Sequence, residues 1–302
     1  MKQTVTLATV VVEFLERPGL AFSTKETYSL TLGLLLQEYG SWPIEIISRQ
    51  TLVEYLNTLT HLKYTTHNKH QAILQSLFNF AIEQGYIKSN PIRGIKQRPP
   101  SREKGEHRTD EIIRFLTPSQ LEILYNAVAD DPRLNAIVHL LHHTGCRIGE
   151  LLALNLESVD LLNWKFQVLG KGNKQRWCFY NEATAIALNK YINYDRHKQS
   201  LALFTAQHPV TMKISRMSYR TLHDYWREIT NKHSLLQGVR IHDLRHTFAT
   251  ERVGIISIEQ LRALMGHESI QTTLRYQKVT SQKAEEAARL AFNLLTKVDK
   301  LD

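Results

Sequence analysis

A basic segment without apolar periodicity divides the 302-residue sequence into two parts. The segment IRGIKQRPPSREKGEHR, residues 92–108, contains six Lys or Arg residues and a Pro-Pro pair. Such a composition is typical of exposed chain between domains, because it offers no apolar face to bury. We therefore expect an N-terminal domain over residues 1–91, a basic interdomain linker over 92–110 and a C-terminal domain over 111–302.

Helical patterns fill the sequence before this segment. Apolar residues recur at helical spacing in residues 23–40, 48–59 and 65–85, and two of these stretches end at a glycine. The opening stretch VTLATVVVEFLE is interrupted by Glu13 and Glu16, and no small-residue cleavage site follows it. We interpret it as the first helix of the fold rather than as a signal sequence.

The second part combines helices with a small sheet. Thr117 and Gln120 form the pattern of a capping box at the start of a helix. Two further helical stretches end at Gly145 and Gly266. The stretch KFQVLGKGNKQRWCFY alternates on both sides of GKGN, which predicts a β-hairpin with Lys171 at its turn.

Charge and cysteine content favour an intracellular protein with an acidic partner. The net charge is +9 and the isoelectric point is about 9.4, which favours nucleic acid or an anionic surface. Cys146 and Cys178 form no disulfide framework, so a reducing cytosol is expected. No apolar run approaches the length of a membrane span.

The stretch IHDLRHTFAT places His242, Arg245 and His246 on one face of a helix. Such a face could hold a metal or grip a phosphate. The pattern HDLRH differs from the zincin pattern H-E-x-x-H by Asp for Glu, and His267 could be a third ligand. Arg245 would place a fixed positive charge beside that metal, which favours the phosphate.

Residues elsewhere in the second part complete a site for phosphoryl chemistry. Arg147 lies at or near a helix start, Lys171 on the hairpin turn and Tyr276 nine residues after His267. Guanidinium groups bind phosphate oxygens bidentately and stay charged. A tyrosine phenol can attack phosphorus, and a lysine or histidine can protonate the departing oxygen. A metal site would leave Arg147, Lys171 and Tyr276 without a role.

Four segments carry a resemblance to a known family. HTGCRIGELLAL, GKGNKQR, HDLRHTFAT and LMGHESIQTTLRY resemble, in the same order, the signature segments of the tyrosine recombinase (phage-integrase) family. The match runs from about Leu116 to Tyr276, and the helical region ending in GYIKSNPI resembles the core-binding domain of that family. The resemblance implies a mostly α, two-domain protein. It implies an N-terminal four-helix, SAM-like core-binding domain and a C-terminal α+β catalytic domain with a small antiparallel sheet.

The resemblance also implies which side chains perform the chemistry. Six catalytic positions match the family, and they are Arg147, Lys171, His242, Arg245, His267 and Tyr276. His242 would assist proton transfer, and His267 would hydrogen-bond the phosphate. Glu150 matches a supporting acidic position that orients the site, and His246 is expected to support it without touching the DNA.

The implied reaction joins a DNA strand to the protein covalently and then transfers it to another strand. Arg147 and Arg245 would clamp the scissile phosphate, and Lys171 would act as the general acid to the leaving 5′-hydroxyl. Tyr276 would form a 3′-phosphotyrosyl intermediate. Because that intermediate keeps the bond energy, a 5′-hydroxyl of a partner duplex can rejoin the strand, and neither metal nor ATP is expected as a cofactor.

The expected partner is a double-stranded DNA recombination site, bound by a homotetramer on two duplexes. We expect a terminal helix over residues 281–298, which would dock on a neighbouring protomer or, equally well, on its own domain. An accessory protein is compatible with the resemblance, and no membrane is involved. Candidate DNA contacts outside the catalytic set are Lys63, His67, Lys69, His70, Lys96, Arg98 and Lys174. The expected location is the cytoplasm, in association with a bacterial-type nucleoid.

Two other functions use related features. A type IB topoisomerase performs similar chemistry without an exchange partner, and a catalytically dead module would only bind DNA. The complete set of six catalytic positions argues against a dead module. Integration, excision, inversion and dimer resolution are all compatible with the implied chemistry.

Overall fold

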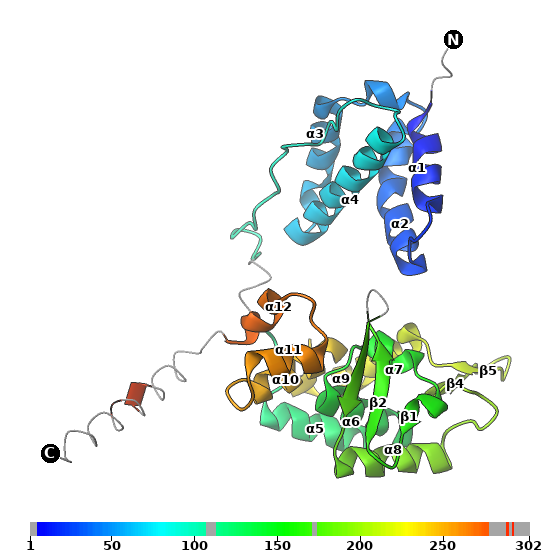
Figure 1. The fold of residues 1–302 in the computed structure, drawn as a ribbon, viewed down its shortest axis with the longest axis vertical. Coiled ribbons are helices and arrows are strands. Elements are labelled where there is room, and N and C mark those ends of the chain that lie inside the picture. Colours follow the sequence, from blue (N-terminus) through cyan, green and yellow to red (C-terminus); the bar gives the residue numbers. More distant parts are fainter. Residues whose placement is uncertain (1–4, 107–112, 171–173, 278–287, 290–291, 293–302) are drawn as a thin grey trace. The chain divides into compact units, whose positions relative to one another are not determined.

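The computed structural model describes residues 5–106, 113–170, 174–277, 288–289 and 292 (Figure 1). The chain divides into two compact units, residues 1–111 and 112–302. Within the described residues, no helix is both long enough and apolar enough to cross a bilayer. Helices dominate both units, and the described strands form two small antiparallel sheets, which confirms the mostly α architecture.

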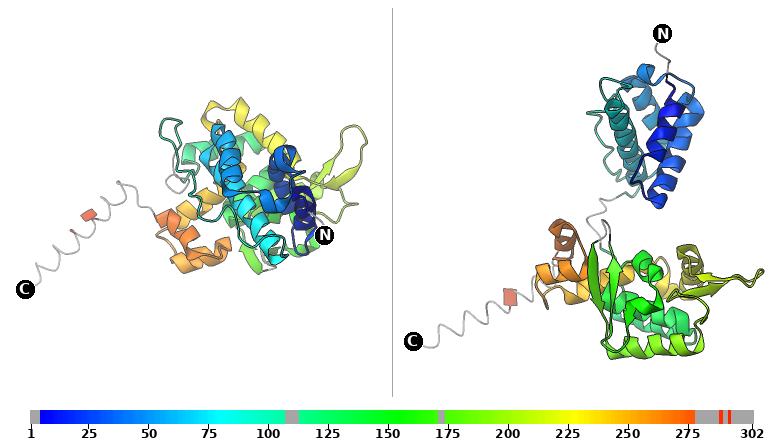
Figure 2. Two further views of the ribbon diagram at one scale, coloured as in Figure 1. Left: turned by 90° about the horizontal axis from the view of Figure 1, so that it is seen from above. Right: turned by 45° about the vertical axis from the view of Figure 1, so that its right-hand side comes forward.

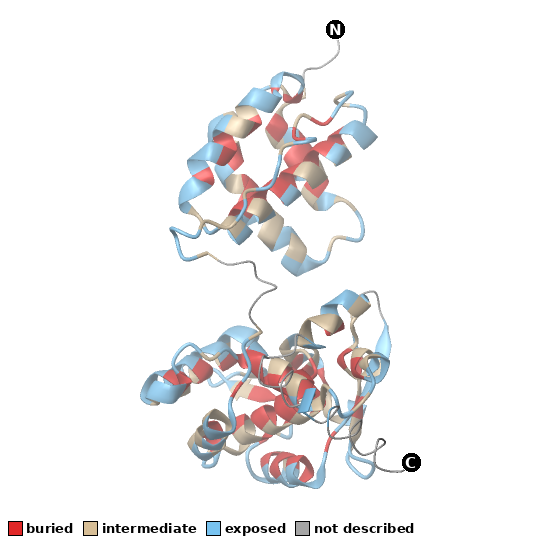
Figure 3. Cartoon of the chain, turned by 90° about the vertical axis from the view of Figure 1, so that its left-hand side faces the viewer, coloured by how far each residue is buried: buried red, intermediate tan, exposed pale blue. Residues whose placement is uncertain are grey.

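Four helices build the described part of the first unit. They are α1 (Leu7–Glu16), α2 (Phe22–Tyr39), α3 (Arg49–Thr58) and α4 (Tyr64–Glu83), with the 3-10 turns η1 (Ile44–Ile46) and η2 (Leu59–His61) between them. The hydroxyls of Thr6 and Ser48 cap α1 and α3. Phe14, Leu35 and Phe78 lie in the buried core of the unit, which is coloured red in Figure 3. Each helix therefore contributes one apolar face to a common core.

The segment after α4 was predicted as an exposed linker. Its described part, residues 92–106, is attached to the first unit by side chains that form hydrogen bonds with its backbone. Arg49 donates to the carbonyl oxygen of Arg93 at 2.9 Å, and Gln71 donates to that of Ile95 at 2.7 Å. An irregular segment needs such partners for its polar backbone groups, and here α3 and α4 supply them.

Helices also form most of the second unit. They are α5 (Pro118–Val128), α6 (Pro132–Thr144), α7 (Ile148–Ala153), α8 (Glu182–Tyr194), α9 (Tyr219–Lys232), α10 (Ile241–Arg252), α11 (Ile258–Met265) and α12 (Ile270–Leu274). The 3-10 turns among the described residues of this unit are η3 (Leu156–Ser158), η5 (Ser234–Leu236) and η6 (Arg275–Gln277). The apolar helix α6 packs against both α8 and α10. Leu140, Leu188 and Leu244, one from each of these helices, are fully buried in the same core.

Two small antiparallel sheets complete the unit. One contains β1 (Val159–Asp160), β2 (Lys165–Leu169) and β3 (Gln175–Phe179), and the other contains β4 (Thr205–Gln207) and β5 (Ile214–Arg216). The predicted hairpin is confirmed as β2 and β3, with Leu169 opposite Gln175. The turned view of Figure 2 shows the β4–β5 hairpin projecting from the helices. Lys171, expected at the β2–β3 turn, lies outside the described residues.

Local capping signals fix where the helices of the site begin and end. The predicted capping box of Thr117 and Gln120 is present at the start of α5. Helices α6 and α11 end at Gly145 and Gly266, whose φ angles are 60° and 61°. Both glycines adopt the left-handed conformation that other residues reach only with strain. The chain therefore leaves both helices at defined points, and the residues that follow enter the site.

Candidate active site

Arg147 stands at the junction between α6 and α7. The turn at Gly145 is packed so closely that a Cβ there would lie 2.4 Å from the Phe248 ring. Two residues later, Arg147 is the N-cap of α7, and its backbone N–H donates to Glu150 at 2.8 Å. Its guanidinium also donates to Glu150 at 2.8 Å, and to the carbonyl oxygen of Gly266 at 3.2 Å. The arginine is thus held from both sides while 40% of its side chain stays exposed.

Arg245 joins the ends of α6 and α11 from within the protein. It lies on α10 and is only 3% exposed. Its guanidinium donates to the carbonyl oxygens of Gly145 and, at 2.7 Å, Met265. Burial, and then the charges of Arg147 and Arg176, lower the pKa of Arg245 to about 10, so it remains protonated at neutral pH. The site therefore contains a buried, permanent positive charge.

Arg176, which was not among the predicted site residues, belongs to the same cluster. It lies on β3, and its guanidinium donates to both carboxylate oxygens of Glu150 at 2.9 and 2.6 Å. Its Nε donates to the carbonyl oxygen of Leu264 at 3.1 Å. A signal was available, because strand alternation places Arg176 on the same face as the buried Cys178. A charged residue on the inward face of a strand needs a partner.

Glu150 is the carboxylate that balances these arginines. Burial by itself would raise its pKa, but hydrogen bonds from Arg176 and from the backbone of Arg147 lower the pKa to about 2. Arg147 and Arg176 form ion pairs with this carboxylate, and its charge also acts on Arg245, so three guanidinium groups are balanced by one carboxylate. The excess of positive charge suits the cluster to bind an anion.

Tyr276 lies on η6 and is close to two histidines. Nδ1 of His246 is 2.7 Å from the phenol oxygen of Tyr276. The His267 ring is parallel to the Tyr276 ring, with 6.4 Å between the centroids. Burial raises the pKa of Tyr276, so the phenol keeps its proton at neutral pH. The contact places His246 directly beside Tyr276, as a residue that supports a catalytic side chain.

The other two histidines of the predicted set take different positions. Nδ1 of His267 pairs with the Thr273 hydroxyl at 2.9 Å, and burial, followed by the charges of Arg245 and Arg147, lowers the pKa of His267 to about 3. His242 has an exposed side chain whose ring meets that of His246 edge-on, 4.8 Å between centroids. The protein packed around His242, and then Arg245, lower its pKa. Both imidazoles are therefore neutral at physiological pH.

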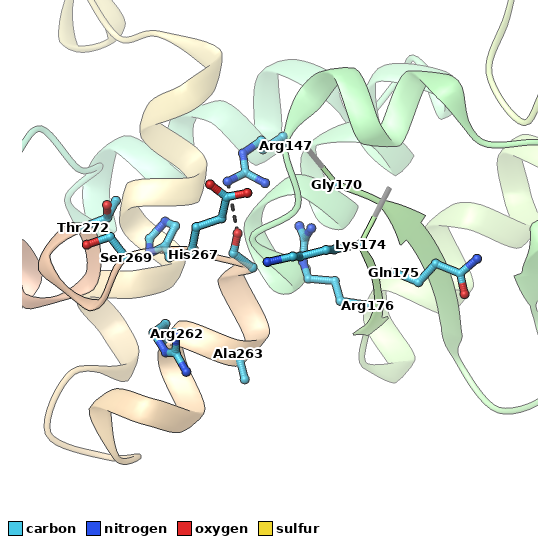
Figure 4. Close-up of a pocket in the computed structure, with 12 residues that line it drawn as sticks. Arg147, Gly170, Lys174, Gln175, Arg176, Arg262, Ala263, His267, Ser269 and Thr272 are labelled. Carbon is cyan, nitrogen blue, oxygen red and sulfur yellow. Dashed lines mark hydrogen bonds between the residues drawn. The ribbon is translucent and has the colours of Figure 1, made fainter. Parts of the chain in front are cut away.

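A depression of about 510 Å³ opens beside this cluster (Figure 4). Arg147 and His267 line it, and Arg176 and Lys174 reach it from the hairpin. Gly170 lines it as well, and the next residue in the sequence is Lys171. Cationic and neutral donor groups thus dominate the border of the depression, which also includes the carboxylate of Glu268.

The predicted DNA contacts of the first unit divide into exposed and buried side chains. Lys63, Lys69 and Lys96 are exposed and could reach a phosphate. His67 is buried and pairs through Nε2 with the carbonyl oxygen of Leu56 at 3.0 Å, so its ring is part of the helix packing.

Two further candidates of that unit are also withdrawn from its surface. His70 is buried, and burial lowers its pKa. Arg98 forms an ion pair with Glu106 at 2.6 Å and donates to the carbonyl oxygen of Thr60 at 2.8 Å. Burial keeps the His70 ring within the fold of the first unit, and a phosphate would have to compete with Glu106 and Thr60 for Arg98.

The alternative of a metal site at HDLRH meets an obstacle at Asp243. This residue stands where the zincin pattern has its glutamate. Its carboxylate is buried and accepts hydrogen bonds from the backbone and guanidinium of Arg240, at 2.9 and 2.7 Å. Among the residues that the structure describes, no group of three or more His, Cys, Asp or Glu side chains could hold a metal ion.

Known proteins resemble this chain in both sequence and fold. The model of the phage integrase family matches residues 114–283. The chain is 29% identical over 254 residues to a tyrosine recombinase XerC of Lactobacillus delbrueckii subsp. bulgaricus, a match that covers 82% of this chain and 83% of that protein. It is 30% identical over 261 residues to a tyrosine recombinase XerC of Caldanaerobacter subterraneus subsp. tengcongensis, covering 81% and 68%.

Solved structures give the same result for the fold. The Tn1549 transposon integrase in complex with transposon right end DNA matches with a TM-score of 0.74 and 23% identity, covering 95% of this chain and all of that one. A lambda integrase dimer bound to a COC' core site matches with a TM-score of 0.70 and 17% identity, covering 91% and 96%. At these identities the likeness concerns the fold.

Proposed function

The chain belongs to the phage integrase family of tyrosine recombinases, and from this premise we propose how its side chains break and rejoin DNA. The protein is a tyrosine-type, site-specific DNA recombinase. One observation carries the proposal for the site. His267 lines the arginine-bordered depression and also lies parallel to the ring of Tyr276. A phosphate bound in the depression would therefore lie close to a tyrosine hydroxyl.

In this proposal the scissile phosphate binds between Arg147 and His267. Arg147 is the half-exposed arginine of the cluster, and its guanidinium offers N–H groups to the phosphate oxygens. Arg245 is buried and contributes its charge from within the protein. Their charges stabilise the negative charge that grows as phosphorus becomes five-coordinate. Glu150 and Arg176 keep Arg147 in place through their hydrogen bonds.

Tyr276 then exchanges one phosphate ester for another. Its oxygen bonds to phosphorus while the bond to the 5′-oxygen breaks, and Lys171 gives that oxygen a proton. His242 assists the proton transfers at the site. The 3′-phosphotyrosyl ester keeps the energy of the original bond. A 5′-hydroxyl of the partner duplex can therefore attack it and restore a phosphodiester, and the arginines take the electrostatic part that a metal ion plays elsewhere.

The substrate of this reaction is a double-stranded recombination site. The matched Tn1549 integrase is described in complex with DNA, and the matched lambda integrase as bound to a core site. Exposed Lys63, Lys69 and Lys96 supply positive charge for contacts with the DNA phosphates.

We further propose that four protomers act on two duplexes, with residues 281–298 of each docking on a neighbour. That segment lies outside the described residues apart from Ala288, Arg289 and Phe292. The matched bacterial relatives favour a cytoplasmic location beside the nucleoid, and an accessory protein is compatible with this scheme.

An exchange assay with two DNA sites tests the function. The site is first selected from a random-sequence duplex pool by binding, and plasmids with one or two copies of it are then compared. The proposal expects deleted or inverted products from the two-site plasmid alone. Relaxation of the one-site plasmid without any exchange between two sites would instead indicate a type IB topoisomerase.

A further inference from the structure

The proton of the Tyr276 phenol must leave before or during attack on phosphorus, and the assisting role of His242 in proton transfer does not specify which group accepts this proton. A phenol is a weak nucleophile until a base takes that proton. Lys171 has the opposite task, since it protonates the leaving oxygen. The acceptor therefore has to be a neutral base within hydrogen-bonding reach of the phenol oxygen.

His246 meets the geometric requirement. Its Nδ1 lies 2.7 Å from the phenol oxygen of Tyr276, which is the length of a well-formed hydrogen bond. The two side chains come from α10 and η6 and are 30 residues apart in the sequence. When Nδ1 accepts the phenol proton, the second ring nitrogen of His246 carries the imidazole hydrogen.

Packing holds both partners in this arrangement. The ring of His242, one helical turn earlier on α10, meets the His246 ring at 89° with 4.8 Å between the centroids. Tyr276 packs on a small apolar cluster that includes Phe248 and Met265. Because neighbours restrain both rings, the contact between phenol and imidazole is part of the fold rather than a chance encounter of two exposed side chains.

The charge state of His246 suits an acceptor. Burial, and then His242, lower its pKa to about 4, so its imidazole is neutral at physiological pH. A pKa this low also makes His246 a weak base, and the negative charge of a bound phosphate would raise that pKa toward the range of an effective base. Arg240 and Arg275 lower the pKa further, whereas the carboxylate of Asp243 raises it. Asp243 would also offset the positive charge that His246 gains when it takes the proton.

The other histidines of the site are placed less well for this task. The ring of His242 faces the ring of His246, and its side chain is exposed. His267 stacks parallel to Tyr276 at 6.4 Å between centroids, and its Nδ1 is engaged with Thr273. The contact at the phenol oxygen is that of His246.

We propose that His246 is the general base that takes the phenol proton of Tyr276 during strand cleavage. This role rests on the proposed function, in which Tyr276 is the nucleophile. In the forward step the proton passes to Nδ1 of His246, the tyrosine oxygen bonds to phosphorus, and the 5′-oxygen leaves with a proton from Lys171. In the rejoining step the 5′-hydroxyl attacks the phosphotyrosine, and His246 returns its proton to the departing tyrosine oxygen.

The test separates a base from a residue that only positions Tyr276. His246→Gln keeps a hydrogen-bond acceptor beside the phenol but is not a base, and His246→Phe keeps the ring volume alone. Single-turnover cleavage is measured on a duplex carrying the selected site, together with the affinity for that duplex. Both variants should bind normally and cleave about a hundred- to ten-thousandfold more slowly. Near-normal cleavage by His246→Gln would reduce His246 to a positioning residue and overturn the proposal.

A second measurement tests the proposal even if a variant loses rate for a reason other than the missing base. Incorporation of 3,5-difluorotyrosine at position 276 gives a phenol that releases its proton more readily. It should restore most of the lost rate to both His246 variants, and it should not restore a His267→Gln control. Absence of this selective rescue would contradict a base role for His246.

The failure of this inference can be told apart from failure of the proposed function. If Tyr276→Phe still forms a covalent adduct with DNA, then Tyr276 is not the nucleophile, and the proposed function fails first. If Tyr276→Phe forms no adduct while both His246 variants cleave at the normal rate, only the assignment of the base is wrong.

Discussion

Replacing Glu150 by glutamine should destabilise the second unit by about 3 kcal/mol, because it leaves buried Arg176 without its carboxylate partner. The two side chains are only 7% and 11% exposed, so water screens their interaction little. Arg147 would lose part of its restraint as well, since Glu150 accepts hydrogen bonds from both its backbone and its guanidinium.

Two arguments lead to this magnitude. The pKa of Glu150 is about 2 in the folded protein against an ordinary 4.5, a difference that corresponds to about 3 kcal/mol of stabilisation at neutral pH. Removal of one partner from a buried ion pair costs about 3 to 5 kcal/mol in other proteins. The exposed pair of Glu228 and Lys232 lies on the same unit, and its loss should cost less than about 0.5 kcal/mol.

Urea unfolding followed by tryptophan fluorescence measures the effect in the whole chain. Three of the four tryptophans lie in the second unit, and a Trp42→Phe background removes the signal of the first. In that background Glu150→Gln is compared with the matched control Glu228→Gln.

The pH dependence adds an independent check on Glu150. Its folded pKa lies below its unfolded value, so its stabilisation is complete above about pH 5 and is lost as pH falls toward about 2. The deficit of Glu150→Gln relative to the parent should therefore shrink over that range. A deficit below about 1 kcal/mol at pH 7, or one that does not change with acidification, would refute the buried-pair reasoning.

Three other expectations concern catalysis and assembly. Lys171→Ala should slow cleavage of normal DNA about a hundred- to ten-thousandfold. A substrate with sulfur in place of the bridging 5′-oxygen should restore the rate of Lys171→Ala but not that of Arg147→Ala. Equal rescue of both variants would show that Lys171 is not the general acid. Excess EDTA should leave cleavage unchanged, because arginines stabilise the transition state, and loss of activity that zinc or magnesium restores would revive the metal hypothesis. Truncation after Thr280 should spare binding to one site and weaken pairing of two sites in gel shifts; normal pairing by the truncated protein would rule out docking on a neighbour.

Features with local causes could be predicted from the sequence. The box of Thr117 and Gln120 and the helix ends at Gly145 and Gly266 depend on residues within one turn of each other. The β2–β3 hairpin follows from alternation around a glycine-containing turn. At the helix ends the deciding hydrogen bonds join residues within one turn, and in the hairpin they join two strands that follow one another directly along the chain.

Features that depend on distant partners could not be predicted in the same way. Arg176 meets Glu150 across 26 residues, and neither side chain identifies the other in the sequence. The basic composition of residues 92–106 predicts exposure, but it does not reveal that Arg49 and Gln71 hold that segment to the first unit. Composition describes what a segment could bury, whereas its attachment depends on which donors the rest of the fold presents.

The contact between His246 and Tyr276 depends partly on local spacing, which the sequence shows, and partly on a distant partner, which it does not. Helical spacing correctly groups His246 with His242 on α10. It does not show that η6 places the phenol of Tyr276 beside Nδ1 of His246, because that placement depends on the turn at Gly266 and on α12. The family resemblance identified the two residues, and the fold supplies their distance.

Covalent capture tests the assignment of Tyr276 as nucleophile most directly. The protein is incubated with a duplex carrying the selected site and a nick next to the cleavage position, so that the released fragment diffuses away and the adduct accumulates. Peptide mass spectrometry then locates the attached nucleotide. We expect the nucleotide on Tyr276 through a 3′-phosphate, and no adduct from Tyr276→Phe despite normal binding. An adduct on any other residue, or one formed by Tyr276→Phe, would contradict this mechanism.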